Sequence, residues 1–128
     1  MDSVFSRSTQ PDRPTWLALA ERCEKATGPD QDVDWCIHAA IIDWPARYKP
    51  IQPSNPEYTA SLDAITALIE RDLPGWRWKA GRAEFHCWAT IYGGPDEGSV
   101  FSAVSIQGCA ALALCAAFCR AMAEKASA

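Results

Sequence analysis

The sequence lacks any apolar run long enough to cross a membrane. Its longest run spans residues 109–119, well short of the roughly twenty residues that a membrane-spanning helix needs. The first residues are polar and include proline, so they do not resemble a secretory signal. We therefore expect a cytoplasmic protein that makes no contact with a membrane.

Positive charge is also scarce. Lysine and arginine number 12 against 16 aspartates and glutamates, which gives a net charge of −4. A protein that binds the phosphate backbone needs a clustered cationic face. We therefore expect no direct contact with nucleic acid, and the acidic balance leaves mimicry of nucleic acid as a lesser alternative.

Recognisable metal and cofactor motifs are absent too. No zinc-type CxxC pair occurs. Cys36 and His38 diverge by about 200° on a helix, while His86 and Cys87 point to opposite faces of a strand. The acidic residues in 30–34 lack the glycine and the later glutamate of a calcium loop, and no glycine-rich phosphate loop is present. The sequence therefore predicts no metal site and no cofactor.

Catalytic signatures are missing as well. In a cytoplasmic setting the cysteines are predicted to be reduced, buried small hydrophobic residues. An apolar helix raises a thiol pKa, which disfavours a redox role for Cys115 and Cys119. We therefore expect that the protein is not an enzyme. The alternative is an enzyme that uses His86 beside Glu84, or a cysteine. The six cysteines are Cys23, Cys36, Cys87, Cys109, Cys115 and Cys119.

The residues that are present suffice for one domain. The chain has 128 residues, of which 48% are hydrophobic, and a chain of this length buries roughly two thirds of its unfolded surface. Residues 1–13 are polar without periodicity, which predicts a flexible arm. Residues 14–125 are predicted to form the single domain.

The first half of this domain is predicted to be helical. Apolar residues at helical spacing indicate helices over residues 14–27, 31–44 and 61–73. The prolines in residues 45–57 restrict the chain to extended or turn geometry, so we expect a fixed surface connector. The signals that bound the helices are Pro14, Gly28-Pro29, Asp30, Thr59 or Ser61, and Leu73-Pro74-Gly75.

The second half changes to a period of two beyond Gly75, which indicates strands. A last helix over residues 109–125 is apolar around most of its circumference, so we expect it to be deeply buried. The predicted strands are residues 76–79, 84–92 and 100–107, joined by a hairpin turn at Ala80-Gly81-Arg82 and a loop at residues 93–98.

Four phrases of the chain occur in a recognisable order. They are ATGPD at residues 26–30, YTASLDA at 58–64, PGWRW at 74–78 and ALALCAA at 111–117. Together they resemble a small family of phage and prophage proteins, the phage ABA sandwich type. The resemblance implies an α/β/α sandwich in a phage or prophage setting, and thus the cytoplasm of a host cell. It implies no reaction.

Taken together, these patterns predict an α+β fold, an α/β/α sandwich. Its parts are N-terminal helices, a three-stranded antiparallel sheet and a buried C-terminal helix. One face of the sheet is predicted to carry aromatic residues beside arginine and lysine. It is second-layer core if a helix covers it, and an interface if it is open. The residues predicted to bind a partner are Arg77, Lys79, His86, Trp88, Tyr92, Phe101 and Tyr48.

The expected function is binding rather than catalysis. We expect a non-enzymatic accessory protein of a phage or prophage that binds a protein partner, most concretely an inhibitor of a host defence complex, similar to an anti-CRISPR protein. This expectation rests on analogy with small acidic phage proteins that occlude a surface. The alternative is a virion or morphogenesis component that forms a homo-oligomer through its aromatic sheet face.

Overall fold

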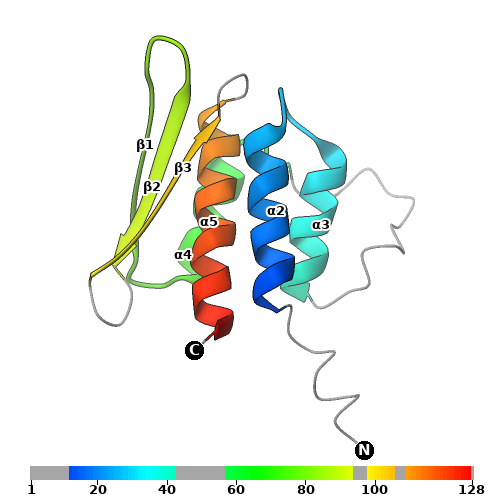
Figure 1. Cartoon of the computed structure of the whole chain (residues 1–128), viewed down its shortest axis with the longest axis vertical. Coiled ribbons are helices and arrows are strands. Elements are labelled where there is room, and N and C mark those ends of the chain that lie inside the picture. Colours follow the sequence, from blue (N-terminus) through cyan, green and yellow to red (C-terminus); the bar gives the residue numbers. More distant parts are fainter. Residues whose placement is uncertain (1–11, 43–56, 94–97, 106–108, 128) are drawn as a thin grey trace, which may run out of the picture.

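The computed structural model describes residues 12–42, 57–93, 98–105 and 109–127 (Figure 1). The α+β class, the order of elements and the three-stranded antiparallel sheet are confirmed. The predicted connector with Tyr48 and nearly all of the predicted arm lie outside the described residues. The described elements are α2 (Arg13–Lys25), α3 (Gln31–Ile42), α4 (Leu62–Asp72), β1 (Arg77–Arg82), β2 (Cys87–Gly93), β3 (Ser99–Ser105) and α5 (Ala110–Ser127).

The helices begin where polar side chains accept backbone N–H groups. Asp12 caps α2 through the amide of Thr15, and Pro14 occupies its first turn. Asp30 caps α3, and Ser61 caps α4. These helix starts are close to the predicted ones, since a cap is a local signal that needs no tertiary context.

The end of α2 differs from the prediction. The helix stops at Lys25, and Ala26 follows in extended geometry with φ −67° and ψ 142°. Gly28 is not among the described glycines with positive φ, which are Gly75 and Gly93. The helix predicted over residues 14–27 thus ends two residues early, and the expectation that Gly28-Pro29 ends it, with Gly28 as a left-handed cap, is wrong.

The sheet has the order β1-β2-β3, with both pairs antiparallel. The predicted turn at residues 80–82 is wrong, because these residues continue β1 and Arg82 is paired with Cys87. The hairpin connection is residues 83–86, where the Ala83 amide donates to the His86 carbonyl at 2.7 Å. Phe85 is consequently 79% exposed in the connection instead of lining a strand face.

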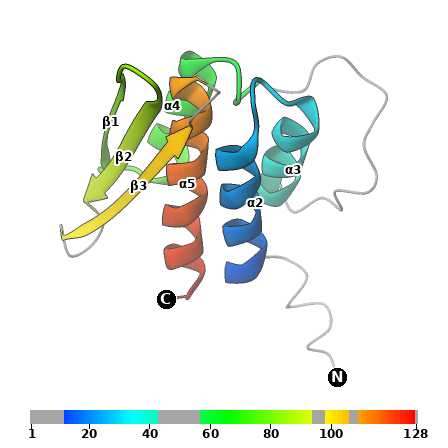
Figure 2. The same cartoon turned by 45° about the horizontal axis from the view of Figure 1, so that its top comes forward.

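Helix α5 lies at the centre of the molecule, between the sheet and α2 (Figures 1 and 2). Residues 111–119 of α5 are all buried, and Phe118 meets Trp16 of α2 edge-on with ring centroids 6.0 Å apart. A helix that is apolar all round can fill this central layer. The described helices thus lie on one side of the sheet, and the second helical layer of the sandwich packs against α5 instead of the sheet's other face.

Candidate partner-binding face

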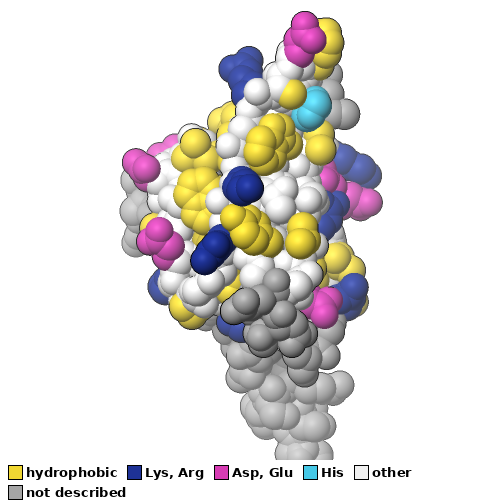
Figure 3. All heavy atoms as spheres, turned by 90° about the vertical axis from the view of Figure 1, so that its left-hand side faces the viewer, with side chains coloured by type: hydrophobic (Ala, Val, Ile, Leu, Met, Phe, Trp, Pro, Cys, Tyr) yellow, Lys and Arg dark blue, Asp and Glu magenta, His cyan; other side chains and the backbone are white. Residues whose placement is uncertain are grey.

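The side of the sheet turned away from α5 is the outer face (Figure 3). Cys87, Ala89 and Ile91 of β2 are buried, so alternate residues of β2 and their cross-strand neighbours point outward. None of the described helices covers this face, and Val100 on it is 61% exposed. The outer face comprises Arg77, Lys79, Gly81, Trp88, Thr90, Tyr92, Val100, Ser102 and Val104.

The outer face carries cations and no acidic side chain. Arg77 and Lys79 belong to it, and the three strands contain no aspartate or glutamate, although the whole chain has a net charge of −4. Lys79 Nζ lies 5.7 Å from the centre of the Tyr92 ring, a cation–π contact. In Figure 3, cationic side chains lie among hydrophobic ones in the middle of the view, and acidic ones lie toward its margins.

Trp88 lies across β1 at Gly81. The two residues are cross-strand partners, and a Cβ added at Gly81 would lie 2.7 Å from Cζ2 of the indole. Because Gly81 has no side chain, the half-buried Trp88 indole can lie over its backbone. Aromatic rings are known to cover glycines of edge strands in this way. Gly81 has this packing role in place of the turn role that its sequence position indicated.

We expect Gly81→Ala to displace the Trp88 indole from β1. The fold should persist because Gly81 does not have positive φ, and we expect a cost of about 1 kcal/mol in the free energy of unfolding. The indole N–H resonance of Trp88 and urea denaturation measure the two effects. Gly28→Ala is the matched control, since nothing lies within 4 Å of a Cβ added there. An unshifted Trp88 resonance would contradict this packing.

Phe101 does not belong to the outer face. Its cross-strand partner is Ile91, and its ring stacks on Trp76 with centroids 5.9 Å apart. The prediction that it accompanies Trp88 and Tyr92 is therefore wrong. The register places Val100 opposite Tyr92, and a shift of one residue moves every side chain of a strand to the other face.

His86 lies in the hairpin connection, outside the three strands whose residues make up the outer face. It follows Phe85, at one end of the sheet, where Figure 3 shows the hairpin projecting beyond the body of the molecule. Of the seven residues predicted to bind a partner, the structure brings together four on the outer face. These are Arg77, Lys79, Trp88 and Tyr92.

The cysteines are free thiols used in packing. Burial raises the pKa of Cys115 and Cys119 well above the ordinary thiol range, so little thiolate forms near neutral pH. The Cys115 thiol donates to the Tyr58 carbonyl at 3.3 Å, and Cys109 donates to Thr59 in the same way. Within the described residues, no three histidine, cysteine, aspartate or glutamate side chains gather as metal ligands.

Thr59 is also held by α3, through contacts that the sequence patterns missed. The buried Asp34 accepts the Thr59 amide at 2.7 Å, and the Asp30 amide donates to the Thr59 hydroxyl at 2.8 Å. Burial raises the pKa of Asp34 despite the hydrogen bonds from Thr59. The capping role predicted for Asp30 is confirmed, whereas Asp34, in the first turn of α3, binds the Thr59 amide.

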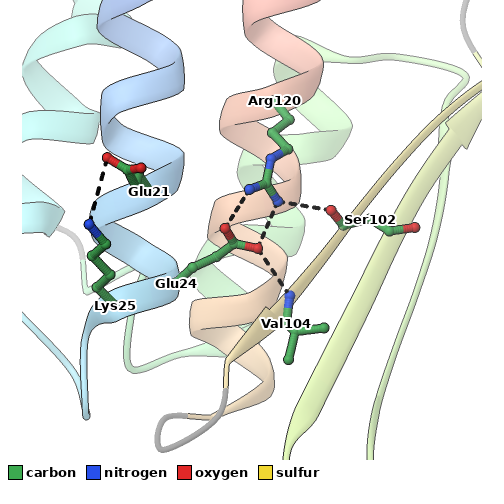
Figure 4. A network of polar contacts seen from close by, with 6 residues as sticks. All are labelled: Glu21, Glu24, Lys25, Ser102, Val104 and Arg120. Carbon is green, nitrogen blue, oxygen red and sulfur yellow. Dashed lines mark hydrogen bonds and ion pairs between the residues drawn. The ribbon is translucent and has the colours of Figure 1, made fainter.

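A second missed cluster joins α2, α5 and β3 (Figure 4). Arg120 donates through both terminal nitrogens to Glu24, including an Nη1–Oε2 contact of 2.8 Å. Arg120 also donates to the Ser102 carbonyl at 2.9 Å, and Glu24 accepts the Val104 amide at 3.3 Å. These contacts tie the edge of β3 to two helices.

The described part of the chain contains no helix with the length and apolar content needed to span a membrane. No family model matches this chain, and no curated protein or solved structure is similar to it. The resemblance to the phage ABA sandwich type therefore stays a prediction.

Proposed function

We propose that this chain is a small non-enzymatic accessory protein of a phage or prophage that binds a protein partner through the outer face of its sheet. The observation that carries the proposal is an open sheet face with cations among aromatic and aliphatic side chains, in an acidic protein. Open patches of this composition are typical of protein interfaces. Its cations favour a partner surface that is acidic around an apolar centre.

The most concrete version of this proposal is an inhibitor of a host defence complex that acts by covering a surface, as anti-CRISPR proteins do. It is supported by the phage-like phrases of the sequence and by an interface without catalytic groups. The alternative of self-assembly in a virion receives less support, because two outer faces brought together would each present Arg77 and Lys79.

An enzymatic function receives less support from the described residues. His86 lies in the hairpin connection. Burial raises the pKa of the Cys115 and Cys119 thiols, so these two are poor nucleophiles near neutral pH. Replacing His86 and each cysteine should therefore leave the function intact. Loss of function in these variants, with the fold preserved, would favour the enzyme.

Two changes on the outer face test the proposal. We expect Lys79→Glu and Tyr92→Ala each to weaken partner binding by about tenfold or more, since aromatic and cationic anchors dominate protein interfaces. Binding is measured by affinity capture from a host lysate that contains defence complexes, followed by titration of the captured partner. Circular dichroism checks that both variants are folded.

Lys25→Glu is the matched control for the charge reversal. Lys25 lies in α2 and its side chain is 76% exposed, so this variant changes the net charge equally without touching the sheet. We expect it to bind the partner as the unmodified chain does. Capture of self-oligomers or virion proteins alone would overturn the inhibitor proposal, and equal loss of binding in all three variants would overturn the assignment of the outer face.

A further inference from the structure

We propose that the free edge of β1 accepts an extended segment of the partner as an additional strand, and that this segment alternates acidic and apolar residues. This inference rests on the proposed function and specifies the partner's chemistry. Strand addition to a sheet edge is a common mode of peptide recognition, in which main-chain hydrogen bonds supply affinity and alternate side chains supply specificity. Such binding requires a sheet edge whose backbone groups are unoccupied, and the two edges of this sheet differ in this respect.

The hairpin fixes which backbone groups of β1 point outward. Ala83 is hydrogen-bonded to His86, and bonded and non-bonded pairs alternate along an antiparallel ladder. Counting back from this pair, the odd-numbered residues of β1 bond to β2. The amides and carbonyls of Trp78, Ala80 and Arg82 therefore point away from the sheet.

The same alternation is verified at the opposite edge. It requires the backbone groups of Ser102 and Val104 in β3 to point outward, and these are the groups that bond to Arg120 and Glu24 (Figure 4). The ion pair thus occupies the backbone positions that another strand would need. Covering an edge in this way is a known defence against unwanted strand pairing.

The edge of β1 has no such cover among the described residues. No described side chain or helix hydrogen-bonds to the outward groups of Trp78, Ala80 and Arg82, and β1 is the terminal strand of the sheet. Trp78 is 37% exposed, and Arg77 and Lys79 on either side of it are also exposed. The open edge is therefore accessible along most of β1.

Charge selects the occupant of this edge. An added strand places alternate side chains beside Arg77 and Lys79 on the outer face, which favours glutamate or aspartate there. Its other side chains lie on the inner side, next to Trp78 and Ala80, which favours apolar residues. A second copy pairing through its own β1 would bring lysine and arginine side chains together, and cationic edges of this kind discourage self-pairing.

A synthetic peptide tests this inference without the natural partner. The probe is a capped peptide of alternating glutamate and valine, about six residues long, the usual length of a strand, and its counterpart replaces glutamate with lysine. We expect the acidic peptide to bind the full chain at least about tenfold more tightly than the basic one. Amide exchange followed by NMR should show new protection at Trp78 and Ala80, and unchanged protection at Lys79 and Gly81.

Ala80→Pro separates edge pairing from contact with the outer face. The ring removes an outward N–H and blocks an added strand, yet proline is tolerated in edge strands when its nitrogen faces solvent. We expect this variant to lose peptide binding, and Ala80→Ser, which keeps the N–H, to retain it. Lys79→Glu is a second variant that does not perturb the backbone. Because Arg77 remains, it should remove most of the preference between the two peptides.

Several results would overturn strand addition. They are equal binding of both peptides, protection confined to other strands, and a folded Ala80→Pro variant with unchanged peptide binding. If Ala80→Pro keeps the captured partner while Tyr92→Ala loses it, the proposed function stands and strand addition fails. If Ala80→Pro loses the captured partner while Tyr92→Ala keeps it, strand addition stands and the assignment of the outer face fails instead.

Discussion

Phe118→Ala is expected to remove about 4 kcal/mol from the free energy of unfolding. Phe118 is fully buried in α5 and contacts Trp16 edge-on, so its loss leaves a cavity in the layer that both the sheet and α2 pack against. Domains are usually stable by only about 5–15 kcal/mol. We therefore expect a large fall in the urea concentration at the midpoint of unfolding, measured by circular dichroism.

Two controls in the same chain make this prediction specific. Phe85→Ala is the same substitution at a site that is 79% exposed, and we expect it to change stability by less than about 0.5 kcal/mol. Phe118→Leu retains most of the apolar volume and should cost much less than alanine. Similar losses for Phe118→Ala and Phe85→Ala would contradict the central position of α5.

The burial of α5 was predictable because the signal is local and strong. Residues 109–119 are apolar at nearly every position, and a helix of that kind has no side that favours water. The same pattern explains the one surprise in the layering. A helix that can be buried on all sides can lie in the middle of the molecule, which leaves one face of the sheet without a helix among the described elements.

The two faces of β2 were also predictable, but their relation to β3 was not. Alternation along a strand places Val100 and Phe101 on opposite faces of β3, but it does not show which of them faces α5. That choice depends on the register, and the hairpin after β1 was placed three residues too early because Gly81 resembled a turn residue. Gly81 instead gives space to Trp88, a contact made across strands.

The cluster at Glu24 and Arg120 had no signal in the sequence. The two residues are 96 positions apart, and each is an ordinary charged residue in its own helix. Their partners on β3 are backbone groups, which carry no sequence signature. A prediction of this site requires the packing of α2 against α5 and the edge of β3, and these follow only from the tertiary structure.

Arg120→Met breaks this pair and is expected to lower the free energy of unfolding by about 2 kcal/mol. The half-buried Glu24 carboxylate loses its cation, and the Ser102 carbonyl at the edge of β3 loses its donor. The hydrogen bonds from Arg120 hold the pKa of Glu24 below its ordinary value. A lowered pKa in the folded state means that ionised Glu24 stabilises the fold. This contribution is fully present above the ordinary glutamate pKa and is lost as pH falls through the folded pKa.

The pH dependence distinguishes an ion pair from a packing effect. We expect the stability difference between the unmodified chain and Glu24→Gln to shrink as pH falls below about 4.5, where the unfolded carboxyl becomes protonated. Asp34 has a raised pKa and shifts stability in the opposite direction, but it is present in both proteins and cancels in the difference. A double-mutant cycle over Glu24→Gln and Arg120→Met then gives the coupling energy of the pair. A difference that stays constant with pH, or a coupling near zero, would show that Arg120 stabilises the fold by its bulk instead of its charge, and the edge of β3 would then be held by packing alone.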